Sequence, residues 1–270
     1  MPVADSAYAA AAAAGLAPYR AAFAAVGLEL VPRPWDLGPG DGAAALALFA
    51  WGYHFDVTRW EAMLAAWPAD RLLFNPPALL AWNTRKTYLL ELEAAGIPIV
   101  PSWFGRADAD SVAAAFQAFD CEELVVKPQI SAGSHETVRV KRGDPVVPLD
   151  DAIVQPFLPA IAEEGELSLF AIGGHFSHAA RKVATGGDFR IQPQFGGAFS
   201  RYEPDAEAMS VFEAVLAALP VAPLYVRVDL LRRADGNLSL IEVETIEPDL
   251  YPGITFEVPA RLAEAIGVRL

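Results

Sequence analysis

The sequence predicts an α+β protein in which a small N-terminal α/β domain (residues 1–80) precedes a larger α+β domain (residues 81–270). In the first domain, helical segments alternate with short apolar segments, which is typical of a small parallel sheet. Two successive prolines, Pro76 and Pro77, then mark a break, because proline stops both a helix and a strand ladder. From residue 124 onward, strands follow one another as hairpins with helices between them, which favours an antiparallel sheet.

The composition excludes several classes of protein. Of 270 residues, 34 are acidic and 20 are basic, so the formal net charge is −14, and the chain lacks the cationic surface of proteins that bind nucleic acids or anionic membranes. The longest apolar run, residues 9–17, is too short to span a bilayer, and Asp5 precedes the first basic residue, unlike in a signal peptide. The single cysteine, Cys121, excludes an internal disulfide and fits a reducing compartment. We therefore expect a cytoplasmic protein that has neither a nucleic acid nor a membrane as its partner.

The N-terminal domain is expected to begin with an alanine-rich helix. The helical pattern covers residues 7–27, and Pro18 interrupts it or separates two pieces, because proline removes a helix hydrogen bond. A second helix is expected at residues 60–67. The strands expected in this domain are short and apolar: residues 28–31, 45–50 and 72–74.

The C-terminal domain is expected to begin with an amphipathic helix, residues 84–95. Gly96 closes this helix at a position where a left-handed backbone is common. Further helices are expected at residues 111–119 and 206–219. The strands expected in this domain are residues 97–100, 124–127, 137–140, 153–156, 167–172, 176–181, 225–231 and 238–246.

The last two strands form the most informative feature of the sequence. Asp235 and Gly236 lie between them, and this dipeptide favours a two-residue type I′ turn, in which both central residues have positive φ. Such a turn fixes which residues face each other across the hairpin. The predicted pairs are Arg227–Glu244, Val228–Val243, Asp229–Glu242 and Leu230–Ile241. The charged and the apolar pairs lie on opposite faces, so the apolar face is expected to cover a core.

The pair Asp229–Glu242 needs an explanation, because carboxylates that face each other directly destabilise a hairpin. Arg227 can neutralise part of the charge. A bound Mg²⁺ does so better, since carboxylate oxygens are among its usual ligands. The alternatives are a solvated hairpin face with incidental charges, or a register that differs by one residue.

Two of the four lysines occupy positions where a solvated lysine is unusual. Lys127 ends an apolar strand and Lys86 opens a helix, and an ammonium group in such a place is a good point-charge partner for a phosphate. A strand-end lysine that reaches solvent is the alternative for Lys127. The hydroxyl-rich loop of residues 129–137 follows directly, and such a loop can direct backbone N–H groups toward phosphate oxygens. The extended segment 153–159 offers backbone groups to an adenine edge, and Glu166 offers a carboxylate to ribose hydroxyls.

In their order along the chain, these residues resemble the ATP-grasp ligases, which include D-alanine–D-alanine ligase and prokaryotic glutathione synthetase. The hairpin with its facing carboxylates comes last, after both lysines and Glu166. Three segments are similar to a narrower group, the glutathione-synthetase-like proteins related to the O-ureido-D-serine cyclo-ligase of cycloserine biosynthesis: residues 75–83, 155–159 and 173–182. The resemblance covers about residues 45–252. It implies an ATP-grasp fold, in which two α+β subdomains hold ATP, preceded by a small α/β domain.

The resemblance implies a nucleotide-binding role for each matching residue. The ATP phosphates are expected to contact Lys86 and Lys127. The loop expected to fold over the triphosphate, residues 131–137, contains Ser131, Ala132, Gly133 and Ser134. The adenine ring is expected to lie against Gln155, Phe157 and Leu158, and the ribose against Glu166.

The resemblance also implies a metal and a catalytic set. Mg²⁺ is expected to be held by Asp229, Glu242 and Glu244, although many relatives have asparagine in place of Glu244. Arg227 is expected to steady the transferred phosphoryl group. Lys182 and Arg190 resemble positions near the γ-phosphate and the substrate carboxylate.

The implied activity is that of an ATP- and Mg²⁺-dependent ligase. Such an enzyme activates a carboxylate as an acyl phosphate and joins it to an amine, in another molecule or in the same one, and forms ADP and phosphate. The expected partner is a small amino-acid-like substrate, and homodimers are usual in such families. A small-molecule kinase on the same fold and a non-catalytic nucleotide-binding protein are the alternatives. Residues 51–54 and 247–251 are candidates for the substrate wall, with ordinary aromatic packing as the alternative.

Overall fold

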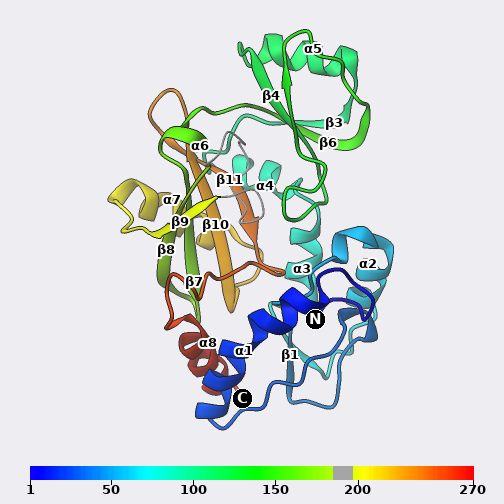
Figure 1. The fold of residues 1–270 in the computed structure, drawn as a ribbon, viewed down its shortest axis with the longest axis vertical. Coiled ribbons are helices and arrows are strands. Elements are labelled where there is room, and N and C mark those ends of the chain that lie inside the picture. The colour runs from blue at the N-terminus through cyan, green and yellow to red at the C-terminus, as the bar shows by residue number, and fades with distance from the viewer. Residues whose placement is uncertain (185–196) are drawn as a thin grey trace.

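The computed structural model describes residues 1–184 and 197–270. Its N-terminal part is the small α/β unit that the sequence predicts, with β1 (Ala44–Leu46) and β2 (Leu72–Phe74) paired in parallel. The helices of this unit are α1 (Ala9–Ala25), α2 (Val57–Ala65) and the short 3₁₀ helices η1 (Trp35–Leu37) and η2 (Tyr53–Phe55). The N-terminal unit lies at the lower right of Figure 1, where α1 runs along its edge.

Three predictions about this unit are wrong. Residues 28–31 form no strand, and the strand expected at 45–50 ends at Leu46. Pro18 lies inside α1 without interrupting it. The helix continues because buried side chains on both sides of Pro18, Leu16 and Phe23 among them, belong to one apolar cluster, while Pro18 itself is exposed.

A four-stranded antiparallel sheet forms the upper part of the molecule (Figure 1). Its strands are β3 (Trp103–Ala107), β4 (Glu123–Pro128), β5 (Val138–Lys141) and β6 (Leu149–Pro156), in the order β3-β6-β4-β5. Helix α5 (Ala109–Ala118) covers it, and its apolar residues pack with the buried side chains of β4 and β6. β3 was not predicted, because Gly105 and the exposed Arg106 break its apolar pattern.

A five-stranded antiparallel sheet forms the centre of the molecule (Figure 1). Its strands are β7 (Glu166–Ile172), β8 (His175–Val183), β9 (Ala198–Arg201), β10 (Tyr225–Arg232) and β11 (Leu238–Glu244), in the order β11-β10-β7-β8-β9. Helices α4 (Tyr88–Ala94) and α7 (Ala206–Ala218) pack against one face of it. At one end of the other face, α1 and α8 (Val258–Gly267) bury Phe170 and Tyr225. The short α6 (Ala160–Glu163) links the two sheets.

Amide side chains from α3 (Pro77–Thr84) and the residues before it hold the free edge of β11. Asn83 donates to the carbonyl of Val243 (2.8 Å) and accepts the N–H of Thr245 (2.8 Å). Asn75 donates to the carbonyls of Tyr225 (2.8 Å) and Thr245 (2.7 Å). These bonds satisfy buried backbone groups along the edge of β11 and at the start of β10, which the sheet itself leaves unpaired.

Two expectations about this region are wrong. The proline pair does not end regular structure, because Pro77 begins α3, and the first turn of a helix does not need the missing N–H. The helix expected at 84–95 begins only at Tyr88, as α4, because Thr84 is the last residue of α3. Gly96 follows α4 with a φ of 87°, as predicted for the residue that closes a helix.

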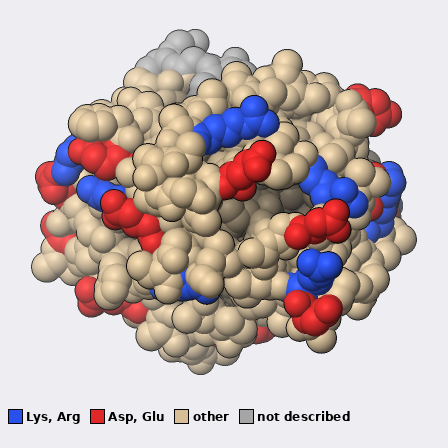
Figure 2. All heavy atoms as spheres, turned by 90° about the horizontal axis from the view of Figure 1, so that it is seen from below, with Lys and Arg blue, Asp and Glu red and all other residues tan. Residues whose placement is uncertain are grey.

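None of the helices in the described part of the chain is long and apolar enough to cross a membrane. Figure 2 shows the face of the molecule seen from below, on which basic and acidic side chains are interspersed and much of the surface is uncharged.

Candidate functional site

A cavity of about 340 Å³ lies between the two sheets. Its walls come from β4 and the end of β6 on one side, and from β7, β8, β10 and β11 on the other. The structure brings together in it every site residue that the sequence predicts, apart from Arg190, which lies outside the described residues. These residues are Lys86, Lys127, Ser131, Ala132, Gly133, Ser134, Gln155, Phe157, Leu158, Glu166, Lys182, Arg227, Asp229, Glu242 and Glu244.

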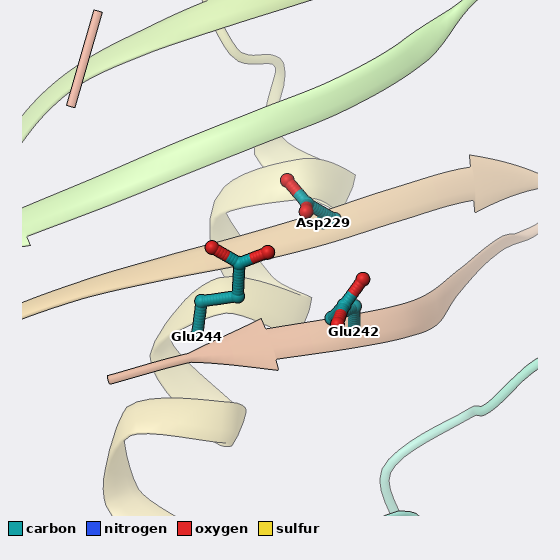
Figure 3. Close-up of side chains that lie close together, drawn as sticks. All are labelled: Asp229, Glu242 and Glu244. Carbon is teal, nitrogen blue, oxygen red and sulfur yellow. The ribbon is translucent and has the colours of Figure 1, made fainter. Parts of the chain in front are cut away.

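Three carboxylates form the centre of the cavity floor. Asp229 on β10 and Glu242 and Glu244 on β11 offer oxygen atoms that all lie within 4.8 Å of one another. Figure 3 shows the three side chains on the same side of the paired strands. Asp229 faces Glu242, and Glu244 faces Arg227, so both charged pairs predicted for the hairpin are confirmed.

Asp229 and Glu242 face each other as predicted, but the turn of the hairpin differs from the predicted one. Its turn has three residues between Arg233 and Asn237, and only Gly236 has positive φ. The longer turn moves the partner of Leu230 to Leu240, and a β-bulge at Ile241 then restores the pairing of Asp229 with Glu242.

The bulge has a clear physical reason. Leu240 and Val243 are both buried in the core beneath the sheet, although their odd spacing would place them on opposite faces of a regular strand. The extra residue lets both side chains reach the core and turns Glu242 and Glu244 toward the cavity.

Cations surround the carboxylates. Arg227 donates to both oxygens of Asp229 (3.1 and 3.0 Å from Nε) and also binds Glu244. Lys182 Nζ lies 3.2 Å from Asp229 Oδ1 and also contacts Glu166. These side chains form a buried network of paired charges and not a solvated hairpin face. Pairing is needed here because an unpaired charge is costly to bury.

The three carboxylates differ in acidity. Burial raises the pKa of Asp229, but Arg227 and Lys182 outweigh it, and the pKa lies at about 2. For Glu242, burial is outweighed by Lys86 and Lys127, so its pKa is also lowered. Burial raises the pKa of Glu244 to about 7 despite Arg227. The surroundings therefore favour the ionised form of Asp229 and Glu242, whereas burial disfavours it for Glu244.

The two predicted phosphate lysines are both buried, but their surroundings differ. Lys86 donates to the carbonyl of Ser131 (2.6 Å) and lies 3.2 Å from Glu242 Oε1. Within the described residues, no hydrogen bond or ion pair engages the ammonium group of Lys127, and burial lowers its pKa. An ammonium group that lines a cavity without a partner is available to an anionic ligand.

Glu166 is held close to Lys182 by the backbone before it. Gly165 has a φ of 86°, and a Cβ at this position would lie 2.4 Å from the carbonyl oxygen of Lys182, so only glycine fits. Burial raises the pKa of Glu166 to about 7, and Lys182 opposes this shift.

The segment that follows β6 offers backbone groups to the cavity. The N–H of Phe157 is bonded to the carbonyl of Glu123 (2.9 Å), and the carbonyl of Leu158 accepts from Ile161 (3.1 Å). No hydrogen bond within the described residues uses the N–H of Leu158. Gln155 is buried and donates to Ser102 Oγ (2.8 Å), which fixes its side chain.

Several apolar residues that line the cavity were not predicted from the sequence. Val125 and Leu231 each lie two positions from a predicted site residue on the same strand, so the alternation of a strand could have identified them. Ile241 could not be found in this way, because the bulge alone turns it toward the cavity. Trp51, His54, Glu247, Asp249 and Tyr251, from the two segments expected as a substrate wall, also line the cavity.

Known proteins are similar to this chain in sequence and in fold. No protein-family model matches the chain. The cycloserine biosynthesis protein DcsG of Streptomyces lavendulae is 31% identical over 221 residues, which cover 73% of this chain and 73% of that protein. The crystal structure of D-cycloserine synthetase DcsG is similar with a TM-score of 0.78 and 25% identity, over 94% of each chain. The structure of the ATP-grasp ligase PsnB with a minimal precursor is similar in fold, with a TM-score of 0.68 and 18% identity, over 95% of this chain and 96% of that one.

Proposed function

Because this chain belongs to the ATP-grasp ligases and has their fold, we propose that it uses ATP and Mg²⁺ to activate a carboxylate as an acyl phosphate and joins it to an amine. The likeness to a D-cycloserine synthetase supports a small, amino-acid-like substrate. The amine belongs to a second molecule or to the same one.

The observation that carries this proposal is the opposition of charges across the cavity. Asp229, Glu242 and Glu244 hold three carboxylate oxygens close together, and Lys86 and Lys127 line the same space. A triphosphate with a divalent cation matches this arrangement, because its oxygens bind the lysines while the cation binds the carboxylates.

The nucleotide is proposed to lie along the cavity between the sheets. Its adenine packs between apolar side chains. The N–H of Leu158, which no hydrogen bond uses in the described part of the chain, donates to the adenine edge. Val125, which pairs with Gln155 across the sheet, lies directly beside this segment. Glu166 binds the ribose, and the loop of residues 131–137 covers the phosphates.

The carboxylate cluster fits Mg²⁺ in the chemistry of its donors. Asp229, Glu242 and Glu244 would hold the ion, and three oxygens within 4.8 Å leave other coordination positions to phosphate and water. A bound Mg²⁺ would neutralise charge on the β- and γ-phosphates. Glu244 in place of asparagine adds a negative charge, which Arg227 neutralises in part by direct contact.

The residues of the chain then position and neutralise the reacting groups. A substrate carboxylate oxygen bonds to the γ-phosphorus, the bond from that phosphorus to the β–γ bridging oxygen breaks, and ADP leaves. The amine bonds to the carbonyl carbon of the acyl phosphate, inorganic phosphate leaves, and the nitrogen loses a proton. Arg227 and Lys182 stabilise negative charge on the phosphoryl group, and Lys86 and Lys127 hold the phosphates of ADP. A similar role for Arg190 stays a prediction.

Calorimetric titration of ATP into the protein, with and without Mg²⁺, tests the nucleotide and metal sites together. We expect binding that depends on Mg²⁺ and that weakens at least tenfold in Glu242→Gln, which keeps the size of the side chain but removes its charge. Glu122→Gln is a matched control, because Glu122 is exposed and lies outside the cavity. Equal Mg²⁺ dependence in the wild type and in Glu242→Gln would show that the metal assignment is wrong.

A further inference from the structure

A second cavity, of about 280 Å³, adjoins the proposed nucleotide cavity. The two cavities share the lining residues Trp51, Phe199, Asp249 and Tyr251. The remaining walls come from α1, from residues 48–49 and from the segment that follows β11. The volume is close to the lower end of the roughly 300–1,000 Å³ that is typical of small-molecule pockets. Neither ATP nor Mg²⁺ accounts for this space.

Aromatic rings dominate the walls of the second cavity. Tyr19, Phe49, Trp51, Phe199 and Tyr251 all line it. The ring centroids of Tyr19 and Phe49 are 5.7 Å apart, and those of Phe49 and Trp51 are 5.4 Å apart. Rings at such distances and tilts attract one another, and an aromatic group that enters can make the same contacts. The lining therefore favours an aromatic guest over a small aliphatic one.

Gly15 is independent evidence that this space is kept open. It lies in the interior of the alanine-rich helix α1, where glycine is less favourable than alanine by about 1 kcal/mol. A Cβ atom at this position would lie 3.1 Å from Cε1 of Phe49 and 3.8 Å from Cη2 of Trp51. Even the methyl group of alanine would thus press on the ring of Phe49, and a larger side chain would extend from there toward Trp51, the next ring of the cavity wall.

Tyr251 connects the second cavity to the charged centre. Its ring lines both cavities, and the guanidinium carbon of Arg227 lies 5.9 Å from the ring centroid. The φ of Tyr251 is 49°, in the left-handed region that a bulky side chain rarely adopts. Backbone strain of this kind is concentrated at functional sites, where the surrounding structure maintains it. A ligand can therefore reach Arg227 with one end and the second cavity with the other.

Asp249 supplies the polar end of the second cavity. Among the described residues that line it, Asp249 is the only one with a full charge, and it lies where the two cavities meet. Its carboxylate accepts the N–H of Tyr251 (2.8 Å) and is otherwise exposed. An anionic group at this point favours a positively charged group of the ligand. An amine held there as ammonium has no free electron pair, so the molecule that carries it supplies the carboxylate and not the attacking amine.

We propose that the carboxylate substrate is an amino acid with an aromatic side chain, and that the second cavity binds this side chain. The inference rests on the function proposed above. The aromatic ring lies against Phe49 and Trp51, the α-ammonium group at Asp249, and the carboxylate near Tyr251 and Arg227. In this pose the carboxylate meets the γ-phosphate and is phosphorylated with release of ADP, as described above.

Trapping with hydroxylamine tests the substrate class without knowledge of the natural amine. Hydroxylamine displaces phosphate from an acyl phosphate and gives a hydroxamate, which is measured together with ADP. The protein is incubated with ATP, Mg²⁺ and both enantiomers of phenylalanine, tryptophan, alanine and serine, each alone. We expect kcat/KM for the better aromatic amino acid to exceed that for alanine and serine at least tenfold, because a fully buried aromatic group contributes more than a methyl group.

A variant of the cavity wall tests the position of the aromatic group. Gly15→Val is expected to raise KM for the aromatic substrate about tenfold. It should leave the Kd of Mg²⁺-ATP unchanged, because Gly15 does not line the nucleotide cavity. Ala14→Val is the matched control, since Ala14 is the exposed neighbour on the same helix and has no contact with either cavity. Thermal unfolding of both variants shows whether they fold. If Gly15→Val does not fold, the comparison of aromatic and small amino acids with the wild-type protein tests the proposal by itself.

Two kinds of failure are distinguishable. A preference for alanine or serine, or no hydroxamate from any of these amino acids while Mg²⁺-ATP binds, overturns the inference and leaves the nucleotide site intact. A Gly15→Val variant that folds and uses the aromatic substrate with unchanged KM also overturns it. Absence of Mg²⁺-dependent ATP binding overturns the proposed function itself.

Discussion

Lys86 and Lys127 should affect nucleotide binding in the same direction and stability in opposite directions. Both line the cavity, and only 5% of Lys86 and 8% of Lys127 is exposed. Lys86 is paired with Glu242 and with the carbonyl of Ser131, whereas Lys127 has no hydrogen bond or ion pair within the described residues. Replacement of either lysine by methionine removes the charge with little change in length.

The expected magnitudes follow from these contacts. Lys86→Met leaves Glu242, whose side chain is 26% exposed, without its closest cation, and it leaves a buried carbonyl without its donor. We expect this to destabilise the protein by about 2 kcal/mol, which lowers Tm by roughly 4–8 °C. Lys127→Met removes a charge that burial disfavours, and we expect a gain of about 0.5–2 kcal/mol. Each variant loses a charged contact to phosphate that is worth about 1.5–3 kcal/mol, or roughly 10- to 150-fold in the Kd of Mg²⁺-ATP.

Scanning calorimetry of the nucleotide-free protein and titration calorimetry with Mg²⁺-ATP measure the two effects separately. Lys141→Met is the matched control, because Lys141 is exposed on β5 and lies outside the cavity. Its only ion pair, to Glu123 at 3.6 Å among the described residues, is on the surface, so Tm should change little. Tm changes of the same sign for Lys86→Met and Lys127→Met would refute the argument from pairing. Wild-type affinity of Lys127→Met for Mg²⁺-ATP would refute its proposed contact with phosphate.

Three further variants test how the fold positions the site. Asn83→Ala leaves the buried N–H of Thr245 without its acceptor, whereas the carbonyl of Val243 still accepts from Tyr88 (2.9 Å), and urea unfolding should show a loss of about 1–3 kcal/mol; a loss below 0.5 kcal/mol, on the order of a surface substitution, would contradict the role given to its amide. Gly165→Ala should destabilise the protein by more than about 2 kcal/mol because of the clash with the Lys182 carbonyl, whereas Gly174→Ala, at a similar φ of 90° but in open space, should cost only about 1 kcal/mol. Equal losses in these two variants would show that the clash is relieved. Burial holds the pKa of His178 at about 4, below 6.5 in the unfolded chain, so its contribution to stability is present above pH 6.5 and is lost as the pH falls toward 4, by at most about 1.4 kcal/mol per pH unit. His178→Phe should reduce this slope in urea unfolding measured between pH 7 and pH 4, and an unchanged slope would mean that other groups produce it.

The hairpin shows how far local sequence reasoning reaches. The facing of Asp229 and Glu242 was predicted correctly, but the predicted pairing of Leu230 with Ile241 is wrong. The Asp-Gly dipeptide is compatible with a two-residue turn and with a three-residue turn that has glycine at its positive-φ position. The core beneath the sheet decides between them, because it buries both Leu240 and the residue three positions later.

The amide of Asn83 shows what local sequence reasoning does not reach. Its segment was recognised as part of a resemblance, but no physical role was apparent from the sequence. In the structure, Asn83 satisfies the edge of a strand that lies 160 positions farther along the chain. Periodicity in the sequence cannot identify such a partner, because neither the segment around Asn83 nor the edge of β11 has a local pattern that points to the other.

By itself, the sequence determined which chemical groups are available and in what order they follow. The apolar strand before Lys127, the small-residue loop after it and the alternating charges of the last hairpin are local patterns, because strand periodicity and turn chemistry act over a few residues. Only the tertiary structure decided that two sheets enclose these groups in one cavity, that a bulge turns Glu242 and Glu244 toward it, and that a second, aromatic cavity adjoins it. The physical reason is that cavities and bulges result from packing between segments more than a hundred residues apart, and such packing depends on the shape of the whole core.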